Sequence, residues 1–125
     1  MASKKVTGIG GIFVKCDNPE KMREWYGKHL GFDISPYGSK FEFKAADNPD
    51  KTITSVWSTF PRDTKNFEKE YMINFRVENI ESLVEELKKN NVTVLDEVAD
   101  YAEYGKFVHI LDLEGNKLEL WEPKE

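Results

Sequence analysis

A chain of 125 residues, of which 39% are hydrophobic and 33% charged, can form one compact core and is too short for two independent domains. Its net charge of −5 comes from acids and bases mixed along the chain, so no basic stripe is available to phosphate backbones and nucleic-acid binding is not expected. No stretch approaches the roughly 20 apolar residues of a membrane span, and no apolar signal segment follows Met1. We therefore expect a soluble, cytoplasmic protein that does not bind membranes.

The sequence repeats its own pattern at an offset of 61 residues. An internal repeat of this kind predicts that one structural module occurs twice. In each copy, apolar and polar residues alternate with period two, which predicts a strand with one covered face that ends at an asparagine. The matching positions are Ile12, Val14, Cys16 and Asn18 in the first copy and Ile73, Phe75, Val77 and Asn79 in the second.

A helix is predicted after each of these strands, over about 19–30 and 80–89. Asn18 followed by Pro19 is typical of a helix N-terminus, with a side-chain cap and a proline in the first turn, and we expect Asn79 to cap the second helix likewise. Gly31 can adopt the left-handed conformation that ends the first helix. Apolar residues recur on one face of both helices, so each helix should lie on a sheet with its charged face outward.

Strand-like runs separated by turn residues follow each helix. The polar residues 61–70 show no pattern and predict a linker. The order strand, helix, three strands therefore occurs twice, which predicts one α+β domain over 6–123, built from two βαβββ modules at about 8–60 and 71–123. The expected later strands are 32–34, 41–44 and 53–57 in the first module and 92–95, 107–111 and 117–121 in the second.

Three segments carry a family resemblance: 10–20 together with 24–26 and 30–32, then 73–80, and finally 112–123. They resemble the first strand and helix, the second-module strand and the closing hairpin of the vicinal oxygen chelate superfamily, which holds glyoxalases, bleomycin resistance proteins and dioxygenases. The resemblance covers about 8–123 and implies the glyoxalase-like fold, in which the curved mixed sheets of two βαβββ modules surround a concave cavity. It also implies a homodimer, because relatives commonly cover their strand edges in this way.

Metalloenzymes of this superfamily hold their metal with up to four ligands, commonly two histidines and two residues of the Glu or Gln type. The positions that match them here are Gly11, the neighbourhood of Trp57, Met72 and Glu119. Only Glu119 matches the ligand pattern, and stable sites need three or four suitable donors. The resemblance therefore implies the fold without the complete metal site, with at most a divalent metal held weakly through Glu119.

The closing hairpin brings two ionisable residues together. The segment 112–115 fits a type I turn followed by a left-handed glycine, which pairs Asp112 with Asn116 and consequently His109 with Glu119. Such a cross-strand pair can be a structural ion pair, the acid and base of a catalytic site, or a pair of metal ligands. We take Glu119 as the candidate base and His109 as its partner.

Further candidates come from the same alternation and from the segment 98–105, which could be a lid over the cavity or a plain surface loop. Arg76 offers a planar fork for a carboxylate, and aromatic residues are typical of small-molecule pockets, although any of them could also be core or a solvated strand end. The candidate substrate-binding residues are Arg76, Asn74, Trp57, Trp121, Met72 and Tyr104.

These residues predict a protein that binds a small molecule, and an anionic one would suit Arg76. Three functions stay open: a lyase or isomerase that acts on a small carbonyl or carboxylate compound, a protein that sequesters a small aromatic molecule without turnover, as bleomycin resistance proteins do, and a structural dimer whose cavity is vestigial. Fold resemblance does not decide among them.

Overall fold

The computed structural model describes residues 5–124, which form two helices and seven strands in the order β1, α1, β2, β3, β4, α2, β5, β6, β7. They group into two compact units. We call Gly11–Tyr71 the amino-terminal unit, and the described residues up to Gly10 together with those from Met72 onward the carboxyl-terminal unit. Neither helix of this described part is long and apolar enough to cross a membrane.

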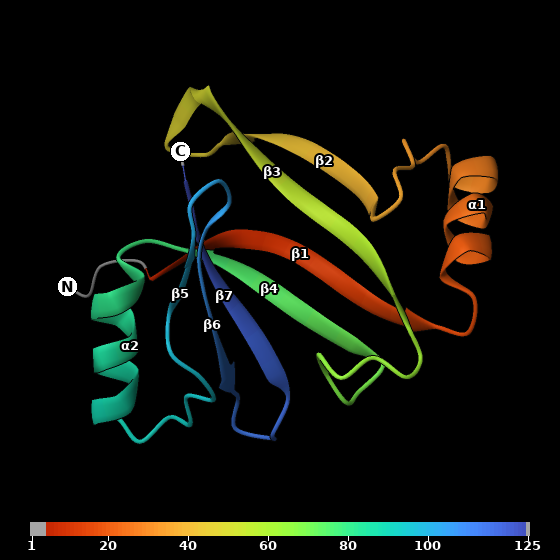
Figure 1. Ribbon diagram of the computed structural model, residues 1–125. Helices are drawn as coiled ribbons and strands as arrows, with labels where there is room; N and C mark the ends of the chain where they lie inside the picture. Colours follow the sequence, from red (N-terminus) through yellow and green to blue (C-terminus); the bar gives the residue numbers. More distant parts are fainter. Residues whose placement is uncertain (1–4, 125) are drawn as a thin grey trace. The chain divides into compact units, whose positions relative to one another are not determined.

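The sheet of the amino-terminal unit has the strand order β2-β3-β1. Strand β3 (Asn48–Pro61) pairs parallel with β1 (Val6–Cys16) and antiparallel with β2 (Gly38–Ala45), as Figure 1 shows. Helix α1 (Pro19–Leu30) begins at Asn18, whose side chain accepts from Lys21 N at 3.0 Å, and it ends at left-handed Gly31. The structure thus confirms both predicted caps of this helix.

One expected strand of this unit is absent from the described structure. The residues 32–34 pair with no strand and form the connection that returns from α1. The Phe32 ring lies 5.1 Å from that of Tyr26 and 5.2 Å from that of Trp57. The apolar run that predicted a strand is therefore explained by aromatic packing beneath the helix.

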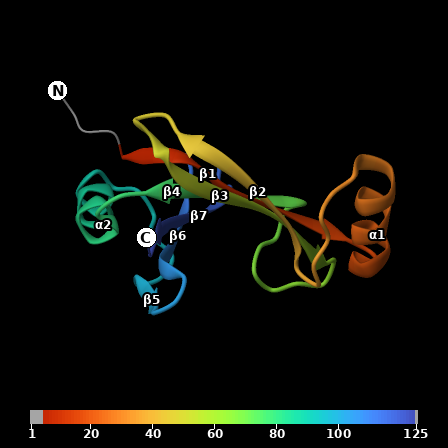
Figure 2. The same cartoon turned by 90° about the horizontal axis from the view of Figure 1, so that it is seen from above.

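The sheet of the carboxyl-terminal unit has the order β4-β7-β6-β5. Strand β7 (Lys117–Pro123) pairs parallel with β4 (Tyr71–Val77) and antiparallel with β6 (Gly105–Leu111), which itself pairs with β5 (Ala99–Tyr101) (Figures 1 and 2). Helix α2 (Ile80–Lys89) covers one face of this sheet. The buried core between them consists of Val77, Ile80, Leu83, Val84, Val108, Ile110 and Leu120.

The predicted cap of α2 is wrong. Asn79 has φ 51°, a left-handed conformation, and its side chain makes no capping hydrogen bond. A capping side chain normally comes from an extended residue. Here Glu122 Oε1 accepts from Ile80 N at 2.8 Å, so a carboxylate from the last strand stabilises the start of the helix.

The connection between α2 and β6 also differs from expectation. The predicted strand 92–95 is reduced to an isolated bridge between Val94 and Ile110. The predicted lid or loop over 98–105 contains strand β5, because Ala99 pairs with Phe107 and Tyr101 with Gly105 in a hairpin. Backbone hydrogen bonds to β6 therefore fix a segment for which the sequence suggested mobility.

Candidate functional site

Strands β6 and β7 meet in the hairpin that the sequence predicts. Asp112 N donates to Asn116 O at 2.9 Å, Gly115 has φ 80°, and His109 is the direct partner of Glu119. The His109 Nε2 and Glu119 Oε2 atoms are 2.8 Å apart. The predicted register is thus confirmed, and both residues lie on the face of the sheet opposite to α2, since their neighbours Val108 and Leu120 belong to the core beneath the helix.

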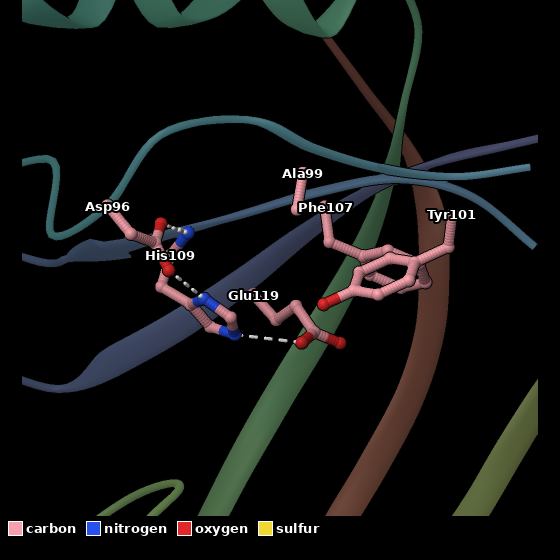
Figure 3. Close-up of a pocket in the computed structure, with 6 residues that line it drawn as sticks. All are labelled: Asp96, Ala99, Tyr101, Phe107, His109 and Glu119. Atoms are coloured by element: carbon pink, nitrogen blue, oxygen red, sulfur yellow. Dashed lines mark hydrogen bonds and ion pairs between the residues drawn. The ribbon is translucent and has the colours of Figure 1, made fainter.

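His109 lies between two carboxylates, as Figure 3 shows. Its Nδ1 is 2.7 Å from Asp96 Oδ2, and its backbone N–H donates to Asp96 Oδ1 at 2.8 Å. The hydrogen bond to Glu119 raises the pKa of His109, burial opposes this, and the hydrogen bond to Asp96 raises the pKa further. The arrangement therefore favours a doubly protonated imidazolium held in one orientation.

Glu119 is held from a second side. Asn74 Nδ2 donates to Glu119 Oε1 at 2.6 Å, and the two residues are partners in the β4–β7 register. The Asn74 side chain is buried, and its Oδ1 has no hydrogen-bond partner among the described residues. Each oxygen of Glu119 thus faces one donor, and the carboxylate has a fixed position.

A cavity of about 240 Å³ opens beside this pair. Its polar end is formed by Asp96, His109 and Glu119, and its apolar wall by Ala99, Tyr101 and Phe107 (Figure 3). The rings of Tyr101 and Phe107 are 5.6 Å apart and nearly perpendicular. An aromatic wall facing a fixed carboxylate and an imidazolium can hold a small ligand and exchange protons with it.

Three further candidates, Arg76, Trp121 and Tyr104, are not among the residues that line this cavity. The Arg76 guanidinium lies over the Trp121 ring, and the Trp121 ring stacks on Phe107 at 5.9 Å, so Trp121 packs against a residue of the cavity wall and Arg76 packs against Trp121. Tyr104 contributes its carbonyl oxygen, which accepts from Trp121 Nε1 at 2.8 Å.

Two candidates are core residues of their own units. Met72 is 3% exposed. Trp57 belongs to the amino-terminal unit, where its ring packs 4.3 Å from that of Tyr26. Neither is among the residues that line the described cavity.

Sequence reasoning missed Asp96 and Tyr101. Asp96 lies 13 residues before His109, and it reaches the site because Leu95 N donates to His109 O at 2.8 Å. Pairing the expected strand 92–95 with β6 would have placed an acid beside His109. Tyr101 lies in the segment 98–105, for which the sequence predicts a lid or loop and not a strand that lines the cavity.

The residues present do not fit the metal site of the resembling superfamily. Both ring nitrogens of His109 face carboxylates, and both Glu119 oxygens face donors. The other matching positions hold Gly11, Trp57 and Met72, which provide no oxygen or imidazole ligand. In the part of the chain that the structure describes, no group of three or more His, Cys, Asp or Glu side chains could hold a metal ion.

Comparison with known protein families identifies the family of this chain. The sequence matches the model of the Glyoxalase/Bleomycin resistance protein/Dioxygenase superfamily over residues 8–120. No curated protein sequence gives a significant match.

Several solved structures are similar. A variant of Streptomyces coelicolor methylmalonyl-CoA epimerase in complex with 2-nitronate-propionyl-CoA has a TM-score of 0.73 at 17% identity, covering 96% of this chain and 99% of that one. Mycobacterium tuberculosis methylmalonyl-CoA epimerase gives 0.65 at 16%, covering 100% and 93%. A Legionella pneumophila structure described as an NAD-dependent benzaldehyde dehydrogenase gives 0.58 at 12%, covering 91% and 98%. At these identities the likeness shows the fold alone, which is the α+β glyoxalase-like fold expected from the sequence.

Proposed function

Because the chain belongs to the Glyoxalase/Bleomycin resistance protein/Dioxygenase superfamily, we propose that it binds a small carbonyl or carboxylate compound in the cavity of the carboxyl-terminal unit and moves a proton on it. The observation that carries this proposal is the fixed position of Glu119 between Asn74 and His109 at the polar end of the cavity. The epimerases among the similar structures favour an isomerase over a lyase.

In this proposal each polar residue has one role. The Glu119 carboxylate accepts the proton of a C–H bond next to the ligand carbonyl, and the electron pair of that bond moves toward the carbonyl oxygen. The His109 imidazolium donates a hydrogen bond to that oxygen while Asp96 holds the ring. Delivery of a proton to the opposite face of the same carbon, with the electron pair returning from the carbonyl oxygen, completes an epimerisation without a metal ligand set.

The ligand must compete for the contact between His109 and Glu119, which are 2.8 Å apart in the described structure. Contacts of catalytic groups commonly rearrange when a substrate binds. The cavity volume of about 240 Å³ is below that of a drug-sized site, so it suits a compound of few heavy atoms. An anionic group on the ligand would have to contact the His109 imidazolium in place of Glu119, because the carboxylates of Asp96 and Glu119 flank that ring.

A second candidate function is sequestration of a small aromatic molecule without turnover. The rings of Tyr101 and Phe107 form its wall, and Tyr101 is 57% exposed, which leaves an aromatic face for stacking. In this function His109 and Glu119 would only provide hydrogen bonds to the polar edge of the guest. Both functions require that a small molecule binds in the cavity, but only the isomerase moves a proton on it.

The test measures binding and proton exchange together. Small 2-oxo carboxylates and aromatic carboxylates are screened at millimolar concentration by thermal shift, since a ligand present at 100 times its Kd stabilises the protein by about 2.7 kcal/mol. Compounds that bind are then incubated in D₂O and followed by NMR. Deuterium should enter next to the carbonyl with the wild-type protein and fail to enter with Glu119→Gln.

Glu114→Gln is the matched control, because Glu114 is exposed in the turn of the same hairpin. It should retain binding and exchange. Binding of aromatic compounds with no exchange would favour sequestration, and the absence of binding by every compound would overturn both functions.

We also infer a homodimer in the cytoplasm. The outer strands of the two units, β2 and β5, leave backbone groups on one side without a strand partner in the described structure. Proteins commonly cover such edges by association with a second copy. Phe43 on β2 is 54% exposed, which adds apolar area to one of these edges.

A further inference from the structure

Gly10 lies against the side chain that holds Glu119. A Cβ atom at this position would collide with Asn74 Oδ1 and would meet Asn74 Cγ at 3.1 Å and Trp121 Cε3 at 2.9 Å. Real Cβ atoms do not approach such neighbours so closely, so the Asn74 amide and the Trp121 ring occupy space that any other residue would fill.

The orientation of the Asn74 amide depends on this space. Its Nδ2 donates to Glu119 Oε1 at 2.6 Å, and its Oδ1 points toward Gly10 with no hydrogen-bond partner among the described residues. A buried oxygen without a partner destabilises the folded state, because it loses the hydrogen bonds that water would give it. The opposite orientation would place Oδ1 against a carboxylate oxygen, and two acceptors in contact repel each other. In the observed orientation, Asn74 Nδ2 therefore donates to Glu119, and Asn74 Oδ1 lies beside Gly10 without a hydrogen-bond partner among the described residues.

We propose that Gly10 is a positioning residue for the Glu119 carboxylate, because its missing side chain leaves the space that the Asn74 amide oxygen occupies while the amide donates to Glu119. This inference rests on the proposed role of Glu119 and adds a specific requirement to it. The three atoms nearest to a Cβ at Gly10 belong to Asn74 and Trp121, so Gly10 acts on Glu119 through Asn74.

Two neighbouring glycines of β1 provide matched controls for Gly10→Ala. A Cβ at Gly8 would meet nothing within 4 Å, so Gly8→Ala tests the effect of alanine alone. A Cβ at Gly11 would meet Val56 Cγ2 at 2.8 Å and Phe13 Cε1 at 3.1 Å, so Gly11→Ala is also overpacked but against residues that do not hold Glu119.

The experiment follows two NMR signals of the ligand-free protein besides its melting temperature. The first is the Asn74 side-chain amide, whose protons should be shifted and protected while they donate to a carboxylate. The second is the titration of the His109 ring. Asn74→Ala removes a donor from Glu119, which leaves more negative charge facing the imidazolium, so the pKa of His109 should rise further.

Gly10→Ala should lose the Asn74 amide signature and should shift the His109 titration upward, as Asn74→Ala does. Gly11→Ala should lower the melting temperature while leaving both signals in place, and Gly8→Ala should change little. In the double variant Gly10→Ala/Asn74→Ala, the added methyl group enters the space of the lost amide, so the alanine at position 10 should shift the His109 titration no further and should lower the melting temperature less than it does alone.

The proposal is overturned if Gly10→Ala keeps the amide signature and the His109 titration of the wild type, or if it shifts that titration downward. If Gly10→Ala alone does not fold, the proposal requires that the double variant folds. None of these measurements uses a ligand. If no substrate is found, the proposed function fails, but the NMR measurements still decide whether Gly10 positions the Glu119 carboxylate.

Discussion

The guanidinium carbon of Arg76 lies 5.2 Å from the centroid of the Trp121 ring, and the Trp121 ring also stacks on Phe107 with 5.9 Å between the ring centroids. Arg76 is only 4% exposed. The sequence left open a solvated strand end for this residue, and the structure shows that alternative to be wrong. A buried cation on an indole face contributes more to stability than an exposed one, because water does not screen the interaction.

Arg76→Met should therefore lower the free energy of unfolding by about 1–3 kcal/mol, since it removes the cation and leaves the bulk. Urea unfolding followed by tryptophan fluorescence measures the change. Arg62→Met is the control, because Arg62 forms its ion pairs with Asp17 and Glu70 at the exposed surface. Equal losses of stability in both variants would contradict the assigned role of the stack.

The stability of the protein should depend on pH through His109. The folded state raises the pKa of this imidazole above its ordinary value of 6.5, so the folded state binds the proton more tightly than the unfolded state. The resulting stabilisation is complete below about pH 6.5 and is lost as the pH rises through the folded-state pKa. Unfolding measured between pH 5 and 9 should show this decline in the wild type and a flatter profile in His109→Gln. A wild-type stability that rises relative to His109→Gln over the same range would refute the assignment.

Asn74→Asp should convert the donor beside Glu119 into a second carboxylate of nearly the same shape. At pH 7 the variant should be less stable than Asn74→Ala, because two buried like charges meet at the 2.6 Å contact. Proximity to Glu119 raises the pKa of the new carboxyl in the folded state, so the deficit should shrink as the pH falls toward 5. The stability loss of Asn74→Ala should not shrink in this way. If the stabilities of the two variants changed in parallel with pH, this would argue against the contact between Asn74 and Glu119.

Glu122→Ala should cost about 1 kcal/mol of stability and should speed the exchange of the Ile80 amide proton, because it removes the acceptor at the start of α2. Asn79→Gly should be neutral or stabilising, since φ 51° favours glycine and the asparagine side chain makes no cap. A large loss of stability in Asn79→Gly, with no loss in Glu122→Ala, would show that Asn79 and not Glu122 caps α2.

Association can be measured directly. Light scattering at tens of micromolar should give about 29 kDa, twice the 14.5 kDa chain. Phe43→Lys on the β2 edge should weaken the dimer, whereas Lys40→Phe on the same strand should not. A wild-type mass of one chain at this concentration would remove the inferred homodimer.

The parts of the site that follow local rules could be predicted from the sequence. The pairing of His109 with Glu119 is fixed by a five-residue turn, and the caps of α1 lie within the helix and its two flanking residues. The contacts that were missed join distant segments. Asp96 reaches His109 across 13 residues and Glu122 reaches Ile80 across 42, and no local pattern encodes such pairs. Tertiary packing also overruled the strand propensity of 32–34.

The place of β7 in its sheet has a consequence for the order of folding. β7 comes after β4 and β6 in the sequence but lies between them in the sheet, and Glu122 on β7 caps α2. Until β7 has paired, β4 and β6 have no common partner, the helix has no cap from Glu122, and Glu119 has not joined Asn74 and His109. The pairing of this one strand therefore assembles the sheet, the helix start and the candidate site together, and the carboxyl-terminal unit should fold in one cooperative step that waits for β7.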